Sequence, residues 1–502
     1  MSLLGIDVGT TGCKAVIFSE EGSLLASAYE EYDFVSHEPG EAELQSSVVW
    51  GKIKESIKSA VARVPGDPVK ALAVSSMGES VVPVTLERGI LGPSLLGFDR
   101  RGEEFTTELK GFLDNARLYR INGNTFGNHY GLTKLLWIKR HRRELYEKTD
   151  KFLLWGSFVA YMLGAEPVAD YSLANRTLLF DLDLGDWSDE LLMEAGIERE
   201  KLPDTAPSGT VIGEVSGKMA AELGLAAGTT ILTGAHDQCA NAVGSGVIRE
   251  GQAMFGMGTY PCILPVFSQR QEPCKMLERG LNTEHHAIDG KFVSFIYNQG
   301  GSIIKWFRDT FAGADRIQAI ASGNDIYDKL NNEIPDQPGG VMVLPHFSVM
   351  GPPHFISDSY GVMLGLRLDT TRGDIFRGIL EGITFALREC VDTLAGAGIE
   401  IGGFRAVGGG SNSDAWVQIT ADIMGRSVVR LKVAEAGALG MAIVAGAGTG
   451  VFARPEDGIA SMVREDKRFD PNPEMQRRYE PRFAKFARLW PLLREYIQNP
   501  AG

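Results

Sequence analysis

The segment at residues 5–18, Gly-Ile-Asp-Val-Gly-Thr-Thr-Gly-Cys-Lys-Ala-Val-Ile-Phe, restricts the fold more than any other part of the chain. Residues 3–8 and 14–18 are apolar enough to form two neighbouring buried strands. The turn between them, at residues 9–12, is rich in glycine, which adopts backbone angles that other residues avoid. The segment therefore predicts a tight β-hairpin.

The tip of this hairpin carries groups that suit a nucleotide phosphate. Backbone N–H groups and the hydroxyls of Thr10 and Thr11 can hold phosphate oxygens, and Lys14 adds a mobile positive charge. Asp7 can bind Mg²⁺ directly or through water. A turn-stabilising role for Asp7 would not account for the Thr-Thr-x-x-Lys that follows it. The segment is not a P-loop, because no Gly-Lys-Ser/Thr occurs in the chain, and taken alone it also fits an ordinary hairpin that turns on Gly-Thr.

Residues 251–264, Gly-Gln-Ala-Met-Phe-Gly-Met-Gly-Thr-Tyr-Pro-Cys-Ile-Leu, repeat the arrangement of strand, Gly-x-Gly-Thr and strand. Two such hairpins half a chain apart predict two similar domains that present phosphate loops across an interdomain cleft. The length of 502 residues fits two domains of roughly 200–250 residues each. We place these domains at 1–247 and 248–502, with C-terminal surface helices from about residue 455.

Elsewhere strands and helices alternate, which is typical of an α/β fold. The charge-free stretch at 436–453 contains five glycines, so we expect a packed core helix there rather than a membrane span. The periodicity of apolar residues predicts strands at 69–75, 229–234 and 404–407, and helices at 45–64, 133–148, 152–163, 188–195 and 374–394.

The composition narrows the class of partner. A net charge of −14 argues against a nucleic-acid-binding protein, which normally shows a basic face. The one dense basic run, at 139–143, follows an apolar helical stretch and fits a solvated helix end. The five cysteines show no pairing pattern and no signal peptide is visible, so we expect a cytoplasmic protein with no membrane contact.

Several further motifs, taken together with the two hairpins, resemble those of one family, the FGGY family of carbohydrate kinases. This family includes the glycerol, xylulose, ribulose and gluconate kinases, and the similarity covers nearly the whole chain. It implies two actin-like, ribonuclease-H-like domains that close on ATP and a sugar or polyol. The motifs are Gly-Ala-His-Asp-Gln at 234–238, Gly-Gly-Gly-Ser-Asn-Ser-Asp-Ala-Trp at 408–416, and the segments at 169–181, 186–192, 361–366, 374–381 and 435–442.

The resemblance assigns the chemistry to Asp237. Phosphoryl transfer to a hydroxyl needs a base that accepts the hydroxyl proton, and the matching aspartate of the family has that role. From composition alone, Asp237 could equally be the N-cap of a helix. Gln238 beside it can hold substrate hydroxyls, because its amide both donates and accepts hydrogen bonds.

The resemblance also implies a nucleotide site shared by both domains. Its ATP-binding residues are expected to be Thr10, Thr11, Lys14, Gly258, Thr259, Gly409, Gly410 and Asn412, with Asp7 as the metal ligand. The glycines of the Gly-Gly-Gly run would let the nucleotide approach the backbone closely. Without this context, the same run is simply a loop after a strand.

The expected acceptor site lies in the first domain. Glu79 matches the glutamate that glycerol kinases use on glycerol hydroxyls, although an exposed loop glutamate is the alternative. The Met-His-Gly stretch of xylulokinases is absent, Gly97 stands where the family has tryptophan, and Gly131 replaces the usual hydroxyl-bearing residue or proline. The candidate substrate-binding residues are Ser76, Glu79, Asp99, His129 and Gln238, with Tyr130 as an alternative to His129.

The sequence thus predicts an ATP- and Mg²⁺-dependent kinase that phosphorylates a terminal hydroxyl. A pentulose or a four- to five-carbon polyol is the preferred acceptor. A homodimer is a further possibility. The alternatives are an ATPase or phosphatase of the actin-like superfamily, a non-catalytic sugar-binding regulator on a kinase scaffold, and a filament-forming structural protein.

Overall fold

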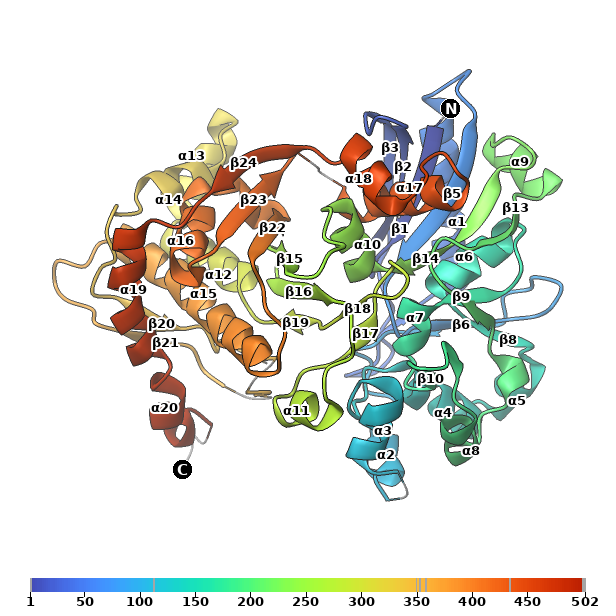
Figure 1. Ribbon diagram of the computed structural model, residues 1–502, viewed down its shortest axis with the longest axis horizontal. Helices are drawn as coiled ribbons and strands as arrows, with labels where there is room; N and C mark the ends of the chain where they lie inside the picture. The colour runs from blue at the N-terminus through green and yellow to red at the C-terminus, as the bar shows by residue number, and fades with distance from the viewer. Residues whose placement is uncertain are drawn as a thin grey trace.

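Two β-sheets organise the chain into two lobes, which lie side by side in Figure 1. The computed structural model describes residues 2–111, 113–348, 350–351, 354–356, 359–432 and 435–498. The first sheet has the order β13-β14-β5-β1-β2-β3. Its strands are β1 (Ser2–Val8), β2 (Gly12–Ser19), β3 (Leu24–Glu31), β5 (Val69–Ser76), β13 (Val211–Glu214) and β14 (Thr230–His236).

The second sheet has the order β17-β18-β16-β15-β22-β23-β24, with β19 also paired to β16. In each sheet an antiparallel hairpin, β1–β2 or β15–β16, is followed outward from its first strand by two parallel strands. The two lobes therefore share one plan. The strands are β15 (Gln252–Gly256), β16 (Cys262–Phe267), β17 (Glu284–His285), β18 (Phe292–Val293), β19 (Ile296–Tyr297), β22 (Gly403–Val407), β23 (Ser427–Leu431) and β24 (Glu465–Phe469).

The helices and the shorter strands surround these sheets. The helices are α1 (Ser46–Ala62), α2 (Glu103–Leu109), α3 (Asn115–Asn122), α4 (Gly131–His141), α5 (Arg143–Lys148), α6 (Trp155–Leu163), α7 (Tyr171–Asn175), α8 (Asp189–Ala195), α9 (Gly217–Leu223), α10 (Asp237–Gly244), α11 (Pro273–Glu278), α12 (Gly301–Phe311), α13 (Gly313–Ser322), α14 (Ile326–Asn332), α15 (Arg372–Gly396), α16 (Asp414–Met424), α17 (Ala436–Gly448), α18 (Pro455–Met462), α19 (Pro473–Phe486) and α20 (Leu489–Gln498), with 3-10 turns at Arg199–Lys201 and Gly409–Asn412. The short strands are β4 (Glu43–Leu44), β6 (Val81–Val84), β7 (Ser94–Leu95), β8 (Lys151–Leu154), β9 (Val168–Asp170), β10 (Phe180–Asp181), β11 (Asp186–Trp187), β12 (Asp204–Ala206), β20 (Met342–Leu344) and β21 (Val362–Leu364).

Helices α10 and α17 pack against each other, and α17 also contacts β1 and β5 of the first sheet. Although α17 comes late in the sequence, Figure 1 shows it beside the strands of the first lobe. The approach is close because glycines face backbone: a Cβ on Gly440 would overlap the carbonyl oxygen of Ala240, and one on Gly5 would overlap that of Ala438. This contact between backbones places the start of α17 next to the first hairpin.

We expect Gly440→Ala to destabilise the protein by about 3 kcal/mol, since an added methyl group must push α17 away from α10. Gly51→Ala is the matched control, because Gly51 lies inside helix α1 with no atom near its missing side chain. That change should be neutral or stabilising by up to about 1 kcal/mol. Denaturant unfolding of both variants measures the difference, and equal stabilities would contradict the packing described.

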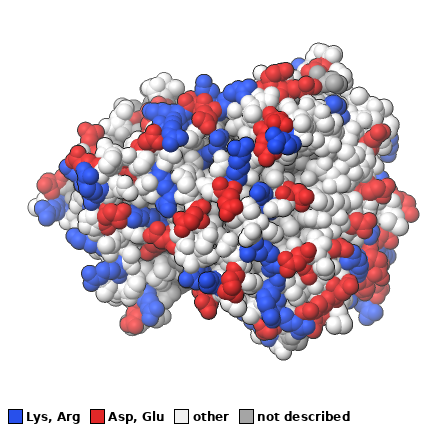
Figure 2. All heavy atoms as spheres, in the orientation of Figure 1, with Lys and Arg blue, Asp and Glu red and all other residues white. Residues whose placement is uncertain are grey.

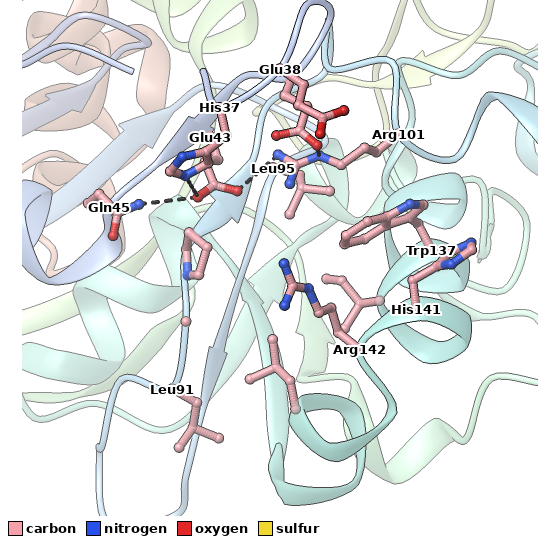
Figure 3. Close-up of a pocket in the computed structure, with 15 residues that line it drawn as sticks. His37, Glu38, Glu43, Gln45, Leu91, Leu95, Arg101, Trp137, His141 and Arg142 are labelled. Atoms are coloured by element: carbon pink, nitrogen blue, oxygen red, sulfur yellow. Dashed lines mark hydrogen bonds and ion pairs between the residues drawn. The ribbon is translucent and has the colours of Figure 1, made fainter. Parts of the chain in front are cut away.

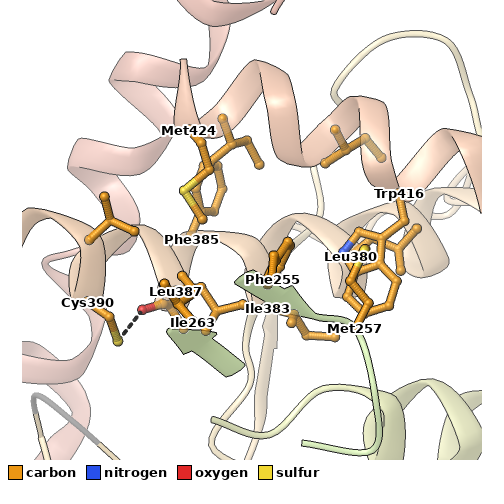
Figure 4. Close-up of a cluster of buried hydrophobic side chains, with 14 of the residues drawn as sticks. Phe255, Met257, Ile263, Leu380, Ile383, Phe385, Leu387, Cys390, Trp416 and Met424 are labelled. Atoms are coloured by element: carbon orange, nitrogen blue, oxygen red, sulfur yellow. Dashed lines mark hydrogen bonds between the residues drawn. The ribbon is translucent and has the colours of Figure 1, made fainter. Parts of the chain in front are cut away.

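The second lobe has its own core around helix α15. Thr371 and Asp374 form a reciprocal capping box at the start of this helix. Figure 4 shows Ile383 of α15 beside Phe255 of β15, and Phe385 of α15 beside Met424 of α16, with Trp416 of α16 at the other end of the cluster. These side chains are almost completely buried. The core fixes the Gly-Gly-Gly loop that immediately precedes α16.

The structure differs from the predicted elements in three places. The helix predicted at 133–148 is two helices, because the backbone leaves the helical region at Arg142. The start of the helix predicted at 152–163 is strand β8, which pairs with β6; a short apolar run fits either structure, and the pairing decides between them. Among the predicted surface helices lies strand β24, and α19 buries Tyr479 and Phe486.

Two surface features bear on partners. On the face that Figure 2 shows, basic and acidic side chains are interspersed over both lobes. None of the helices in the described part of the chain combines the length and apolar character that a membrane crossing requires.

Candidate active site

The first hairpin forms as predicted, with Asp7 directly opposite Lys14 in the register. The N–H of Gly9 donates to the carbonyl oxygen of Gly12 at 2.9 Å, which closes the turn. Thr10 and Thr11 stand at the tip, half-buried and exposed respectively. The hairpin therefore presents two hydroxyl groups from a fixed backbone.

Lys14 has a partner that the sequence does not reveal. Its Nζ lies 2.8 and 3.0 Å from the two carboxylate oxygens of Glu435, the residue before α17. Burial raises the pKa of Asp7, although the Ser75 hydroxyl, which donates to Asp7 Oδ1 at 2.8 Å, and the charge of Lys14 both oppose this shift. The base of the hairpin thus combines one cation with two carboxylates, those of Asp7 and Glu435.

Asp237 lies at the junction of β14 and α10. It is the first residue of the helix, and the N-cap is His236, so its carboxylate does not cap the helix. Asp237 Oδ1 is buried and has no hydrogen-bond partner among the described residues; His236 Nε2 lies 3.2 Å away, outside hydrogen-bonding geometry. The side chain is nevertheless 32% exposed, so a substrate can reach it.

The electrostatic surroundings of Asp237 favour a proton acceptor near neutral pH. Burial, followed by the nearby carboxylates of Asp7 and Glu79, raises the pKa of Asp237 to about 7. Burial and the charge of Arg176 hold the pKa of His236 well below its usual range, so this imidazole is neutral. A carboxylate with a pKa close to the working pH suits general-base catalysis.

The loop that carries Glu79 lies next to this pair of residues. Gly78 packs between Arg176 and His236, since a Cβ on Gly78 would lie 3.1 Å from the first and 3.2 Å from the second. Glu79 has a positive φ of 62°, and its Oε1 accepts a hydrogen bond from Arg176 Nε at 2.7 Å. The structure therefore brings Glu79 close enough to Asp237 for their charges to interact.

Gly97 and His129 border the same place. A Cβ on Gly97 would lie 3.7 Å from Glu79 Oε2 and 3.1 Å from the carbonyl oxygen of His129. The His129 ring lies against the Tyr130 ring at an angle of 38°, with ring centres 4.0 Å apart, and Tyr130 in turn lies under the guanidinium of Arg176. Both candidates for this position, His129 and Tyr130, thus flank the loop of Glu79.

The structure does not support the predicted substrate contacts of Ser76 and Asp99, because both side chains are fully buried. Ser76 Oγ accepts a hydrogen bond from the N–H of Gly156 at 3.0 Å. The carboxylate of Asp99 accepts hydrogen bonds from the N–H of Ala42 at 2.7 Å and from Arg101 at 2.6–3.0 Å. Both side chains stabilise loops and have no face toward an acceptor.

Arg101 also lines the pocket of Figure 3, a cavity of about 740 Å³ that none of the residues around Asp237 borders. In that view Arg101 lies beside Trp137 and reaches toward Glu43, which it contacts at 2.9 Å.

Gln238 was predicted to contact the substrate, but its side chain points elsewhere. Its Oε1 lies 3.5 Å from Cys262 Sγ, so the amide is directed toward the second hairpin.

The five ATP-binding residues predicted in the second domain come together around one cavity of about 560 Å³. They are Gly258, Thr259, Gly409, Gly410 and Asn412. Gly410 must be glycine, since a Cβ would overlap the Trp416 ring at the back of the cavity. The size and the mixed apolar and polar lining suit a nucleoside.

Other residues of this cavity were not predicted. Helices α12 and α14 contribute Lys305, Arg308, Tyr327 and Asn331. Asn331 Oδ1 accepts a hydrogen bond from Ser413 Oγ at 2.8 Å, which links α14 to the loop before α16. These residues lie on ordinary amphipathic helices, so no sequence motif marks them.

The oxygen ligands near the first hairpin fit Mg²⁺, which binds through one or two carboxylates together with phosphates and water. Asp7 is half-buried at the end of β1, and Asp237 is close enough for the two charges to interact. No group of three or more His, Cys, Asp or Glu residues in the described ranges forms a ready-made metal cage. The donors thus suit a metal that arrives with a nucleotide.

The chain matches the N-terminal domain of the FGGY family of carbohydrate kinases over residues 2–244, and its C-terminal domain over residues 291–449. It is 26% identical to the xylulose kinase of Bacillus subtilis over 494 residues, 97% of this chain and 96% of that protein. It is 30% identical to the glycerol kinase of Solidesulfovibrio magneticus over 489 residues, 94% of each.

Among solved structures, the xylulose kinase from Rhodospirillum rubrum superposes with a TM-score of 0.88 at 25% identity, covering 99% of both chains. This agrees with an α/β fold of two actin-like domains, each built on the shared plan of hairpin and parallel strands. Together the two family models cover most of the chain. The chain belongs to the FGGY family of carbohydrate kinases and is a phosphotransferase that acts on a sugar or polyol.

Proposed function

We propose that this kinase transfers the γ-phosphate of ATP to a terminal hydroxyl of a pentulose or of a four- to five-carbon polyol. The observation that carries the proposal is Asp237, whose carboxylate is reachable, caps no helix and has a pKa of about 7. The charges of Asp7, in the first hairpin, and of Glu79, in the proposed acceptor loop, both act on Asp237.

In this proposal the acceptor is held by Glu79, and Asp237 takes the proton of the attacking hydroxyl. The hydroxyl oxygen forms the new bond to the γ-phosphorus, while the bond from that phosphorus to the bridging oxygen of ADP breaks. The hairpin tips, with Thr10 half-buried and Thr259 lining the cavity of the second sheet, would hold the phosphate oxygens. Closing the two domains would exclude water and so suppress ATP hydrolysis.

Asp7 would hold Mg²⁺, which when bound neutralises charge on the nucleotide phosphates. Lys14 pairs with Glu435, and its positive charge would also attract the same phosphates. Asp7, held by Ser75, is already fixed for its role.

Gly97 bears on the choice of acceptor. We expect Gly97→Trp to raise the KM for the acceptor about tenfold, because an indole would fill the space beside Glu79 Oε2. The KM for ATP serves as the internal control and should stay within about twofold, since the nucleotide cavity is formed by the second domain. An unchanged acceptor KM would show that the space beside Gly97 is not used.

The pKa of Asp237 predicts a pH profile. The base acts in its deprotonated form, so kcat/KM should rise with pH up to a midpoint of about 7 and level off above it. Glu79→Gln removes a charge that raises this pKa, so its remaining activity should show a lower midpoint. Initial rates of the wild type and of Glu79→Gln, measured across the pH range, test both midpoints. A higher midpoint in Glu79→Gln than in the wild type would contradict the effect of Glu79 on the pKa of Asp237.

The function itself is tested by ATP-coupled assays with pentuloses, tetritols, pentitols, glycerol and gluconate. We expect turnover of at least one of them. ATP hydrolysis without any phosphorylated product would favour an ATPase of the actin-like superfamily. Sugar binding without turnover would favour a non-catalytic regulator. A homodimer and a cytoplasmic location stay predictions, and size-exclusion chromatography with light scattering tests the first.

A further inference from the structure

Arg176, which directly follows α7, is a buried cation between two carboxylates. Its Nε donates to Glu79 Oε1 at 2.7 Å, and Nη2 contacts the same oxygen. On the other side, Nη1 donates to Glu284 Oε1 at 2.5 Å. Burial opposes the charge of Arg176, but the two glutamates outweigh it and raise its pKa.

The two glutamates belong to different parts of the molecule. Glu79 follows β5 of the first sheet, whereas Glu284 lies in β17, at one end of the second sheet. Figure 1 shows β17 beside α7 where the two lobes meet, and the two elements are in contact. Glu284 is almost completely buried and also accepts a hydrogen bond from Asn282 at 2.6 Å, so its position is fixed. Arg176 therefore joins the acceptor loop to the second sheet.

The contact leaves one oxygen of Glu79 available. Arg176 binds only Oε1, and no described residue bonds Oε2, which faces the space beside Gly97. The side chain of Arg176 also packs against Gly78, and its guanidinium lies 5.0 Å from the Tyr130 ring centre. One arginine thus fixes both the backbone and the carboxylate of the acceptor loop.

We propose that Arg176 is a positioning residue that aims Glu79 Oε2 at the acceptor and, through Glu284, couples acceptor binding to the arrangement of the two domains. The inference rests on the proposed function, because it assigns the acceptor to Glu79. Without the guanidinium, two buried carboxylates would face each other, and Glu79 would turn away from its position.

The first test compares Arg176→Ala, Arg176→Lys and wild type with an acceptor that the wild type phosphorylates. We expect the acceptor KM to rise at least about tenfold in Arg176→Ala and less in Arg176→Lys, with the KM for ATP within about twofold. Added guanidinium chloride should partly restore kcat/KM in Arg176→Ala and in neither other protein. Arg377→Ala is the matched control: Arg377 is also buried and paired with a glutamate, Glu381, but lies in the second domain. It should lower the melting temperature and leave the acceptor KM unchanged.

The second test uses Glu284→Gln, which keeps the shape of the side chain and so does not depend on the folding of Arg176→Ala. In the wild type, we expect a non-hydrolysable ATP analogue to tighten acceptor binding, as measured by calorimetry. In Glu284→Gln this tightening should shrink at least about threefold.

Unchanged acceptor KM values in folded Arg176 variants, or equal tightening in Glu284→Gln and wild type, would overturn the inference alone. A wild type that phosphorylates no acceptor would contradict the proposed function and this inference with it.

Discussion

Asp237→Asn is expected to lower kcat by about 10³-fold while ATP still binds. The amide has the same shape as the carboxylate but cannot accept the proton of the attacking hydroxyl. The change should cost little stability, because Asp237 caps no helix and its Oδ1 atom has no hydrogen-bond partner among the described residues. The cavity that we propose for the nucleotide is lined by residues between 257 and 416, so the affinity for ATP should stay within about twofold.

The matched control is Asp189→Asn. Asp189 is also the first residue of a helix, α8, and follows a serine N-cap. Both variants lose a negative charge at a helix N-terminus, an effect of at most about 1 kcal/mol on stability. Only Asp237→Asn should lose activity. Steady-state kinetics and calorimetric ATP binding measure both variants, and a kcat close to wild type in Asp237→Asn would exclude this residue as the base.

Asp7→Asn is expected to reduce kcat/KM for ATP about 10²-fold and to raise the Mg²⁺ concentration needed for half-maximal rate. The amide keeps the hydrogen bond from Ser75 but loses the charge that a cation needs. Ser75→Ala is the control, since it removes that hydrogen bond and leaves the charge, and we expect it to change the same quantities only a few-fold. The measurement is the initial reaction rate of each variant over a range of Mg²⁺ concentrations. An unchanged Mg²⁺ requirement in Asp7→Asn would mean that the metal binds elsewhere.

The sequence predicts the two hairpins well because their information is local. Glycine at fixed places between apolar runs leaves few backbone choices, and the duplicated pattern at Gly258 confirms the plan seen at Gly9. Position 410 requires glycine, because the Trp416 ring occupies the space that any side chain there would need.

What the sequence does not reveal are contacts between distant residues. Lys14 and Glu435 are 421 positions apart, and no pattern in either segment pairs them. Arg176 lies inside a motif that the resemblance identifies, but one of its partners, Glu79, follows a strand of the first sheet, and the other, Glu284, lies in the second.

The incorrect acceptor contacts have a related cause. Asp99 has the residue type of a ligand, but Arg101, only two positions later, occupies its carboxylate. Ser76 ends a strand whose residues are buried on both faces, where alternation does not show which side chains reach a site.

In the proposed mechanism, the two hairpins and Asp237 together deliver the γ-phosphate to a sugar or polyol. The most direct measurement is mass spectrometry of the reaction products of wild type and Asp237→Asn, incubated with ATP, Mg²⁺ and each acceptor of the panel, alongside the rate of ADP release. We expect the wild type to form the phosphorylated acceptor and ADP in equal amounts, and Asp237→Asn to form almost none of either product. ADP released at the same rate without acceptor, with no phosphorylated product, would contradict this mechanism.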